Sequence, residues 1–259
     1  MAEPTDGPAP TADPAVAPAP VLVTDFDGTL YRGDDPIREY ARLAAERLGG
    51  SAGRVLRDGI EAYLAGGAPD SAVPAAVDGW EAVALLGLRH GLDQAALDAA
   101  FLDVRAWMLT DACALEVPSG YAALLAGLRA EGVRVVLATN SPALGLDPLL
   151  RRLDVLPLLD DVVSGTGKPA GLRRLLWREI AAAGAPERVL VIGDHWRNDV
   201  EPGLLLGTAT AYIDRFGRAD GPADAAAREV EDLLDPLRKW AADALAGTHT
   251  TTNPFPEEF

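Results

Sequence analysis

The sequence predicts an α/β fold in which helices cover both faces of a parallel sheet and an all-helical domain is inserted. Two observations predict the sheet: short apolar segments recur along the chain, and amphipathic helical segments alternate with them. A third predicts the insertion, because residues 33–112 contain helical patterns and no convincing strand. An alternating order of strands and helices places the strands in parallel, so one Rossmann-like sheet is expected.

Five apolar segments are expected to form buried strands, at residues 21–23, 133–138, 161–163, 189–192 and 208–213. Helices are expected between them, at residues 121–130, after Ser141-Pro142, and from Pro169 to Ala183. Ser141-Pro142 is a favourable N-cap and first-turn pair, and Gly184 is a favourable helix stop. A last helix is expected at about residues 223–246, packed on the outside.

Within the insertion, helical patterns cover about residues 37–48, 55–64, 80–88 and 94–108. Gly66-Gly67-Ala68-Pro69 is expected to be a loop between two of them, and Pro118-Ser119-Gly120 is expected to mark the return to the sheet domain. These patterns divide the chain into a core domain, at 21–32 and 113–247, and an inserted helical domain at 33–112. Residues 1–20 are expected to be a disordered tail and residues 248–259 a flexible one.

Composition restricts the partners of the chain. The formal net charge of −16 repels nucleic acid and anionic membranes, and no run of about 18 apolar residues indicates a membrane span. Cys113 is the only cysteine and the N-terminal residues lack the pattern of a signal peptide, so a cytoplasmic location is expected. An acidic chain that binds phosphate needs a local cation. Its 23 basic residues include only two lysines, Lys168 and Lys239. The oligomeric state is not predicted.

The candidate site residues follow the predicted strands. Asp25 and Asp27 follow the first strand, Thr139 the second and Lys168 the third, while Asp194 and Asp199 follow the fourth. Because the carboxyl ends of parallel strands share one edge of a sheet, these side chains are expected to converge there. Four carboxylates at one edge repel one another unless a cation neutralises them, and hard oxygen ligands suit Mg²⁺. The sequence therefore predicts a magnesium site.

Four short motifs resemble those of the haloacid dehalogenase-like hydrolases. Asp25-Phe26-Asp27-Gly28-Thr29-Leu30 matches the first motif of that family, and Leu137-Ala138-Thr139-Asn140 is similar to the second. Lys168-Pro169 resembles the third, and Gly193-Asp194 through Asn198-Asp199 the fourth. The resemblance covers about residues 21–215, and the inserted helices are similar to the helical cap of the family.

The resemblance implies a role for each of these residues. Asp25 is expected to attack phosphorus and form an aspartyl-phosphate, and Asp27 to act as general acid and then general base. Phosphate contacts are expected from Thr139, Asn140 and Lys168. Asp194 is expected to bind Mg²⁺ directly, and Asp199 directly or through water. Asp25 and, through its backbone carbonyl, Asp27 complete the metal site expected from the family.

The same resemblance admits several reactions. Dehalogenases of the family lack a carboxylate two residues after the nucleophile, and Asp27 occupies that position here. Phosphonate-cleaving members use a cap lysine, whereas residues 33–112 contain no lysine. The prediction is therefore a phosphatase acting on a small phosphorylated metabolite. Two alternatives stay open: a sugar-phosphate mutase with the same nucleophile, and a non-catalytic relative that binds a phosphorylated ligand.

The substrate itself is not predicted. Helical spacing does not tell which cap residues reach the cleft. The candidates are Arg32, Arg38, Arg42, Trp80, Arg89 and Arg105. His195 and Trp196 lie inside the fourth motif, where an entrance position and ordinary loop packing are equally expected. Trp80 is expected to belong to the core of the cap rather than to stack on a substrate.

Overall fold

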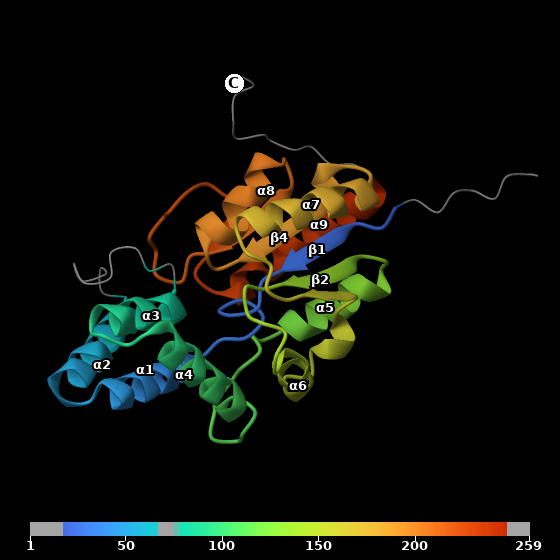
Figure 1. Ribbon diagram of the computed structural model, residues 1–259. Coiled ribbons are helices and arrows are strands. Elements are labelled where there is room, and N and C mark those ends of the chain that lie inside the picture. Colours follow the sequence, from blue (N-terminus) through green and yellow to red (C-terminus); the bar gives the residue numbers. More distant parts are fainter. Residues whose placement is uncertain (1–17, 67–75, 77, 248–259) are drawn as a thin grey trace, which may run out of the picture.

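The structure of the chain, a computed structural model, describes residues 18–66, 76 and 78–247. Six parallel strands form one sheet in the order β3-β2-β1-β4-β5-β6, with helices on both faces (Figure 1), which confirms the predicted fold class. Residues 1–17 of the tail predicted at 1–20, the tail predicted at 248–259 and residues 67–69 of the predicted loop lie outside the described residues. The prediction of a tail is wrong for its last residues, because Pro20 is buried and its carbonyl accepts from the backbone N–H of Arg134 at 2.8 Å. Within the described ranges, no helix is both long and apolar enough to span a membrane.

Apolar side chains of successive strand residues point to opposite faces of the sheet and are buried on both. Its strands are β1 (Val21–Thr24), β2 (Arg134–Ala138), β3 (Asp161–Val163), β4 (Val189–Gly193), β5 (Ala209–Ile213) and β6 (Ala225–Ala227). At the centre, Val23 of β1 is in register with Val136 of β2 and Val191 of β4. These three residues face one apolar cluster, whereas their neighbour Leu22 faces the other. The central strands are therefore buried on both faces, as continuous apolar runs predict.

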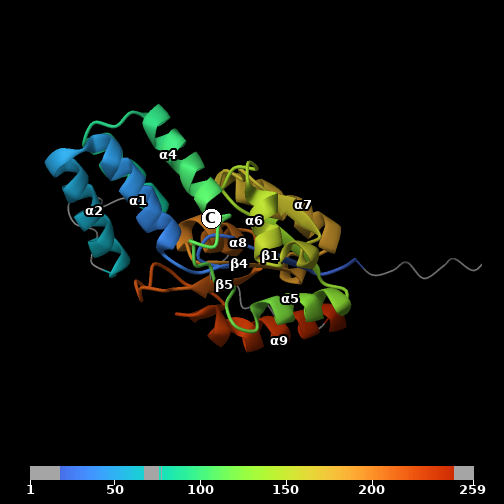
Figure 2. The ribbon, with the colours of Figure 1, turned by 90° about the horizontal axis from the view of Figure 1, so that it is seen from below.

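Helices cover the two faces of the sheet. Helices α5 (Tyr121–Ala130) and α9 (Leu234–Ala246) lie on one face, and α7 (Ala170–Ala183) lies on the other (Figure 2). The sheet domain also contains α6 (Leu146–Arg152) and α8 (Glu201–Leu205). Short helical turns occupy Leu156–Leu158, Pro186–Arg188, Trp196–Val200 and Val230–Leu233.

The described residues of the inserted segment form a separate group of four helices beside the sheet domain (Figure 1). They are α1 (Asp35–Leu48), α2 (Gly50–Leu64), α3 (Gly79–Arg89) and α4 (Gln94–Trp107). The carboxylate of Asp78 caps α3 by accepting from the backbone N–H of Glu81 at 2.8 Å, and Asp93 caps α4 in the same way. The two connections to the sheet domain run side by side, since Arg32 and Glu116 exchange two backbone hydrogen bonds of 2.8 and 3.2 Å.

Two predicted helices are wrong in part. Residues 225–227 form the edge strand β6, so the last helix begins at Leu234 rather than near 223. Alanine favours helix, but pairing with β5 overrides this propensity, and Asp224 fixes the register by accepting from both the backbone N–H and the hydroxyl of Thr210 at 2.9 Å. The helix expected after Ser141-Pro142 begins only at Leu146, because the Ser141 hydroxyl donates to Asp27 instead of capping a helix.

Arg105 is a buried cation near the C-terminus of α4. Only 3% of the residue is exposed, and within the described part of the chain its three guanidinium nitrogens have no hydrogen-bond partner. The guanidinium carbon lies 5.9 Å from the ring centroid of Phe26 and 5.8 Å from that of Phe101. Ring faces stabilise a cation by about 1–2 kcal/mol, which is less than the several kcal/mol that burial of an uncompensated charge costs.

We therefore expect Arg105→Met to stabilise the protein, raising its free energy of unfolding by about 1–3 kcal/mol, because methionine keeps apolar contact with both rings and removes the charge. Urea denaturation measures the change. Arg152→Met is the matched control, since the Arg152 guanidinium donates to the carbonyls of Met108, Thr110 and Cys113 at 2.9–3.0 Å. The control should lose about 1–3 kcal/mol. A comparable loss in Arg105→Met would contradict the argument.

Candidate active site

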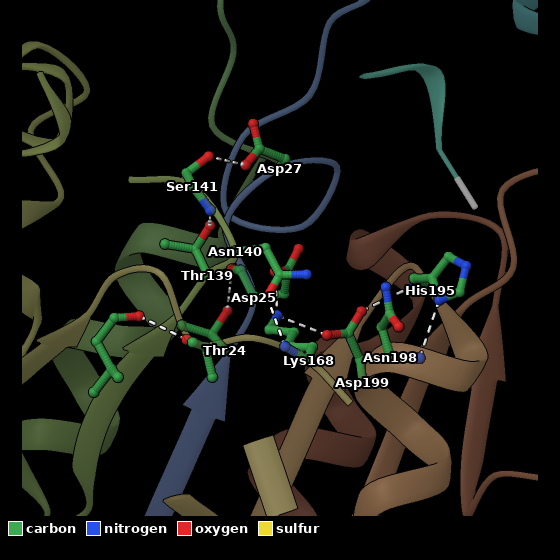
Figure 3. A network of polar contacts seen from close by, with 12 residues as sticks. Thr24, Asp25, Asp27, Thr139, Asn140, Ser141, Lys168, His195, Asn198 and Asp199 are labelled. Atoms are coloured by element: carbon green, nitrogen blue, oxygen red, sulfur yellow. Dashed lines mark hydrogen bonds and ion pairs between the residues drawn. The ribbon is translucent and has the colours of Figure 1, made fainter. Parts of the chain in front are cut away.

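Asp25 and Lys168 form the centre of a polar cluster at the carboxyl end of the sheet (Figure 3). Asp25 directly follows β1, and its backbone N–H donates to the carbonyl of Ile192 in β4 at 3.0 Å. The Lys168 ammonium donates to Asp25 Oδ1 at 2.5 Å and to Asp199 Oδ1 at 2.6 Å. The lysine side chain is 4% exposed, so both ion pairs are shielded from solvent. The local cation expected from the acidic composition is thus in direct contact with two of the predicted carboxylates.

Burial and mutual repulsion both raise the pKa values of carboxylates in this cluster. Burial raises the pKa of Asp25 to about 7, against the opposing effect of Lys168 and with help from Asp199 and Asp27. The pKa of Asp194 is raised well above its usual range by burial and then by Asp25 and Asp199. Burial alone would lower the pKa of Lys168, but Asp199 and Asp25 outweigh it and raise that pKa. One ammonium does not neutralise the cluster, which therefore has room for a further cation.

Three carboxylates are arranged so that they can share a metal ion. Asp25, Asp194 and Asp199 each offer one oxygen, and these oxygens lie within 4.8 Å of one another. An all-oxygen donor set of this kind fits Mg²⁺, which binds through one or two carboxylates and keeps several waters. The side chain of Asp27 is outside this group of three, and the expected role of its backbone carbonyl as a ligand remains a prediction.

Gly28 allows Asp194 to reach the cluster. Its φ of +82° belongs to the left-handed region that favours glycine, and a Cβ at this position would lie 2.1 Å from Asp194 Oδ2. Any other residue would therefore displace the Asp194 carboxylate. The glycine in Asp25-Phe26-Asp27-Gly28 thus has a physical reason, which is the close approach of the fourth motif to the first.

The Asp27 carboxylate lies between two hydroxyl groups. Tyr31 donates to its Oδ1 at 2.5 Å. Ser141 donates to its Oδ2 at 3.0 Å (Figure 3). Burial, followed by the charge of Asp27, raises the pKa of Tyr31, so its hydroxyl keeps its proton. Hydroxyl groups can both donate and accept, so this pair can hold Asp27 in either protonation state. Sequence reasoning missed both partners, and the position of Ser141 directly after the second motif was the available signal.

Thr139 and Asn140 order the loop that follows β2. The Thr139 hydroxyl oxygen accepts from the backbone N–H of Ser141 at 3.0 Å, and Asn140 Oδ1 accepts from the backbone N–H of Lys168 at 2.8 Å. The second bond ties the second motif to the third. The hydroxyl hydrogen of Thr139 stays available for a phosphate oxygen. Their predicted phosphate-binding roles remain predictions.

Hydrogen bonds within the fourth motif fix the loop that carries His195 and Asp199. The backbone N–H of His195 donates to Asp199 Oδ2 at 3.1 Å, and its Nδ1 accepts from the backbone N–H of Asn198 at 3.0 Å (Figure 3). Burial lowers the pKa of His195, so the imidazole is neutral near pH 7. Trp196 donates from Nε1 to the carbonyl of Pro222 at 2.8 Å and packs against the loop between β5 and β6. His195 lines the cleft, whereas Trp196 supports a loop.

A cleft of about 590 Å³ opens over Asp27 and Asp194, between the sheet domain and the inserted helices. Tyr63 and Trp80 from the insertion line one wall, and Phe216 from the β5–β6 loop lies opposite Tyr63 with ring centroids 6.4 Å apart. Trp80 also packs on Tyr40 and Phe101 in the interior of the insertion. It therefore belongs to the core of the insertion, as predicted, and to the cleft as well.

The sequence matches the haloacid dehalogenase-like hydrolases over residues 20–207, which is more than half of the chain. A comparison with curated proteins finds no match.

Solved structures share the fold at low sequence identity. A predicted phosphoglycolate phosphatase from Haemophilus somnus 129PT is 15% identical with a TM-score of 0.62, and the alignment covers 85% of this chain and 98% of that one. The HAD hydrolase YfnB from Bacillus subtilis, bound to magnesium, is 19% identical with a TM-score of 0.57, covering 85% and 99%. A 2-haloacid dehalogenase from Pseudomonas syringae is 18% identical with a TM-score of 0.51, covering 86% and 99%. Phosphatases and dehalogenases thus share this architecture.

Proposed function

Because the chain belongs to the haloacid dehalogenase-like hydrolase family, we propose that it is a magnesium-dependent phosphatase that hydrolyses a small phosphorylated metabolite through an aspartyl-phosphate on Asp25. One observation carries the proposal. A buried carboxylate, Asp25, contacts the Lys168 ammonium at 2.5 Å. Asp27, two residues further along the chain, accepts hydrogen bonds from the Tyr31 and Ser141 hydroxyls. A nucleophile, a cation and an acid–base group are therefore close together at one edge of the sheet.

In the first step, a carboxylate oxygen of Asp25 attacks phosphorus, and the bond from phosphorus to the leaving oxygen breaks. Asp27 in its protonated form gives its proton to that oxygen, so the alcohol leaves neutral. Lys168 stabilises the negative charge shared by the Asp25 carboxylate and the phosphoryl group. The pKa of Lys168 is raised by its two carboxylate neighbours, so it stays protonated throughout.

In the second step, Asp27 accepts a proton from water while the water oxygen attacks phosphorus. The bond between phosphorus and Asp25 breaks, inorganic phosphate forms, and both aspartates return to their starting states. The hydroxyls of Tyr31 and Ser141 keep the Asp27 carboxylate in place during both proton transfers. Asp25, Asp194 and Asp199 would hold Mg²⁺, which supplies positive charge beside the phosphoryl oxygens when bound.

Asp27 favours phosphoryl transfer over dehalogenation, although dehalogenases share the fold. Displacement of halide needs no proton donor at the leaving atom, whereas an alkoxide leaving group does. In this structure the Asp27 carboxylate has two ordered hydroxyl partners, as expected of a group that gains and loses a proton. The mutase alternative uses the same groups and differs only in the acceptor of the phosphoryl group.

We expect the purified chain to hydrolyse p-nitrophenyl phosphate with Mg²⁺, and excess EDTA to lower the rate by about 100-fold or more, because the cation balances charge in the transition state. Release of p-nitrophenolate measures the rate, and added Mg²⁺ should restore it. Turnover of 2-chloropropionate without phosphatase activity would indicate a dehalogenase. Isomerised sugar phosphate formed only with a bisphosphate activator would indicate a mutase. Phosphate-ester binding without any turnover would support the non-catalytic alternative.

A further inference from the structure

The cleft over the catalytic edge is strongly acidic. Its lining includes ten carboxylate side chains and four guanidinium groups. Two of the four guanidiniums are already paired: Arg215 donates to both oxygens of Asp34 at 2.8 Å, and Arg32 contacts Glu116 at 2.7 Å. A substrate therefore brings the leaving group of its phosphate ester into a cleft with excess negative charge, beyond the catalytic aspartates themselves.

Asp78, the N-cap of α3, is a carboxylate of the insertion that acts electrostatically on the catalytic edge. It is half-buried in the cleft wall, and its Oδ1 accepts the capping hydrogen bond of α3 from the Glu81 N–H at 2.8 Å. Burial, with a contribution from the charge of Asp27, raises the pKa of Asp78 to about 6. In turn, Asp78 adds to the effects of burial, Asp25 and Asp199 that raise the pKa of Asp194. The charge of Asp78 thus acts on Asp194, one of the three carboxylates that could hold a metal ion.

We propose that the cleft selects phosphate monoesters whose alcohol part carries no second negative charge and favours those whose alcohol bears an amine, with Asp78 as a residue that determines this specificity. The inference rests on the proposed phosphatase function and adds the substrate class. Lys168 and a metal ion held by Asp25, Asp194 and Asp199 would offset the charge of the phosphoryl group, but a second anion on the leaving group would extend past Asp27 toward Asp78.

An ammonium group on the leaving alcohol is attracted by the same negative charges that repel an anion. It finds the Asp78 carboxylate and the Trp80 ring in the same cleft. The rings of Tyr63 and Phe216 already hold the Arg218 guanidinium, whose carbon lies 5.5 and 4.9 Å from their centroids. Carboxylates attract a cation directly, and ring faces do so through their quadrupole. A cleft of about 590 Å³ is ample for such an alcohol, so charge rather than size is expected to separate small substrates.

Three esters with two-carbon leaving groups test the inference: O-phosphoethanolamine, ethyl phosphate and 2-phosphoglycolate. They differ chiefly in the charge at the end of the leaving group, which is positive, zero and negative. With Mg²⁺ at pH 8, where Asp78 is ionised, kcat/KM should fall in that order, by about tenfold from the first to the last. Equal values, or a preference for 2-phosphoglycolate, would overturn the inference.

The Asp78→Asn variant removes the charge and keeps the cap, since asparagine caps helices as well as aspartate does. It should lower the ratio of kcat/KM for O-phosphoethanolamine to that for 2-phosphoglycolate by about tenfold. This ratio does not depend on the fraction of active enzyme, so partial misfolding cannot imitate the effect. Asp93→Asn is the matched control, because Asp93 caps α4 with the same 2.8 Å bond and does not line the cleft.

The control should keep the wild-type ratio. An unchanged ratio in Asp78→Asn, or an equal change in Asp93→Asn, would overturn the role of Asp78. The p-nitrophenyl phosphate assay distinguishes failure of the substrate-class inference from failure of the proposed phosphatase function. If that ester is hydrolysed and 2-phosphoglycolate is preferred among the small esters, the inference fails and the phosphatase function stands. If no ester is hydrolysed, the proposed function fails and the inference falls with it.

Discussion

Asp25→Asn is expected to abolish phosphatase activity, lowering kcat by at least about 1,000-fold, because an amide cannot form the covalent bond to phosphorus. The variant should keep its fold, since asparagine has nearly the shape of aspartate and its amide oxygen can still accept from Lys168. Initial rates with p-nitrophenyl phosphate measure the effect. Far-UV circular dichroism checks the fold.

Asp161→Asn is a suitable control for this variant. Asp161 begins β3 at the edge of the sheet, where its Oδ1 accepts from the neighbouring N–H of Val162 and its side chain is 44% exposed. Its substitution should change kcat by no more than about twofold, as surface substitutions usually do. Wild-type rates in Asp25→Asn would contradict the covalent mechanism, and loss of circular dichroism would show that Asp25 is needed for folding instead.

Lys168→Met is expected to affect both activity and stability. Loss of the ammonium should lower kcat by about 100- to 1,000-fold, because the charge on the phosphoryl group loses its fixed donor. In metal-free buffer the free energy of unfolding should fall by about 3–5 kcal/mol, since Asp25 and Asp199 are left buried without their cation. Added Mg²⁺ should recover part of this loss, because it neutralises the same carboxylates.

The only other lysine in the chain provides the control. Lys239 is 79% exposed and pairs with Asp243 one turn away at 2.8 Å. Lys239→Met should therefore change stability by less than about 0.5 kcal/mol and leave kcat unaltered. Urea denaturation with and without Mg²⁺ compares the two variants. A stability loss in Lys168→Met that Mg²⁺ does not reduce would contradict a metal site at these carboxylates.

Much of the fold was predictable because its signals are local. Apolar runs such as residues 189–192 are typical of strands buried on both faces, and β4 (Val189–Gly193) is such a strand. Helix α7 ends at Ala183, where Gly184 adopts φ +86° as a helix stop requires. Residues 225–227 were not predictable, since their alanines favour helix and only the free edge of β5 makes them a strand.

The sequence by itself determined the parallel sheet, the inserted helices and the edge at which Asp25, Lys168, Asp194 and Asp199 meet, because the alternation of strands and helices and the positions of the strand ends follow from local patterns. Only the tertiary structure decided what each side chain touches. It placed Ser141 and Tyr31 on Asp27, left the buried Arg105 without a hydrogen-bond partner among the described residues, and brought Asp78 of the insertion to the catalytic cleft. These contacts join residues from separate segments, and their geometry depends on packing that no local pattern records.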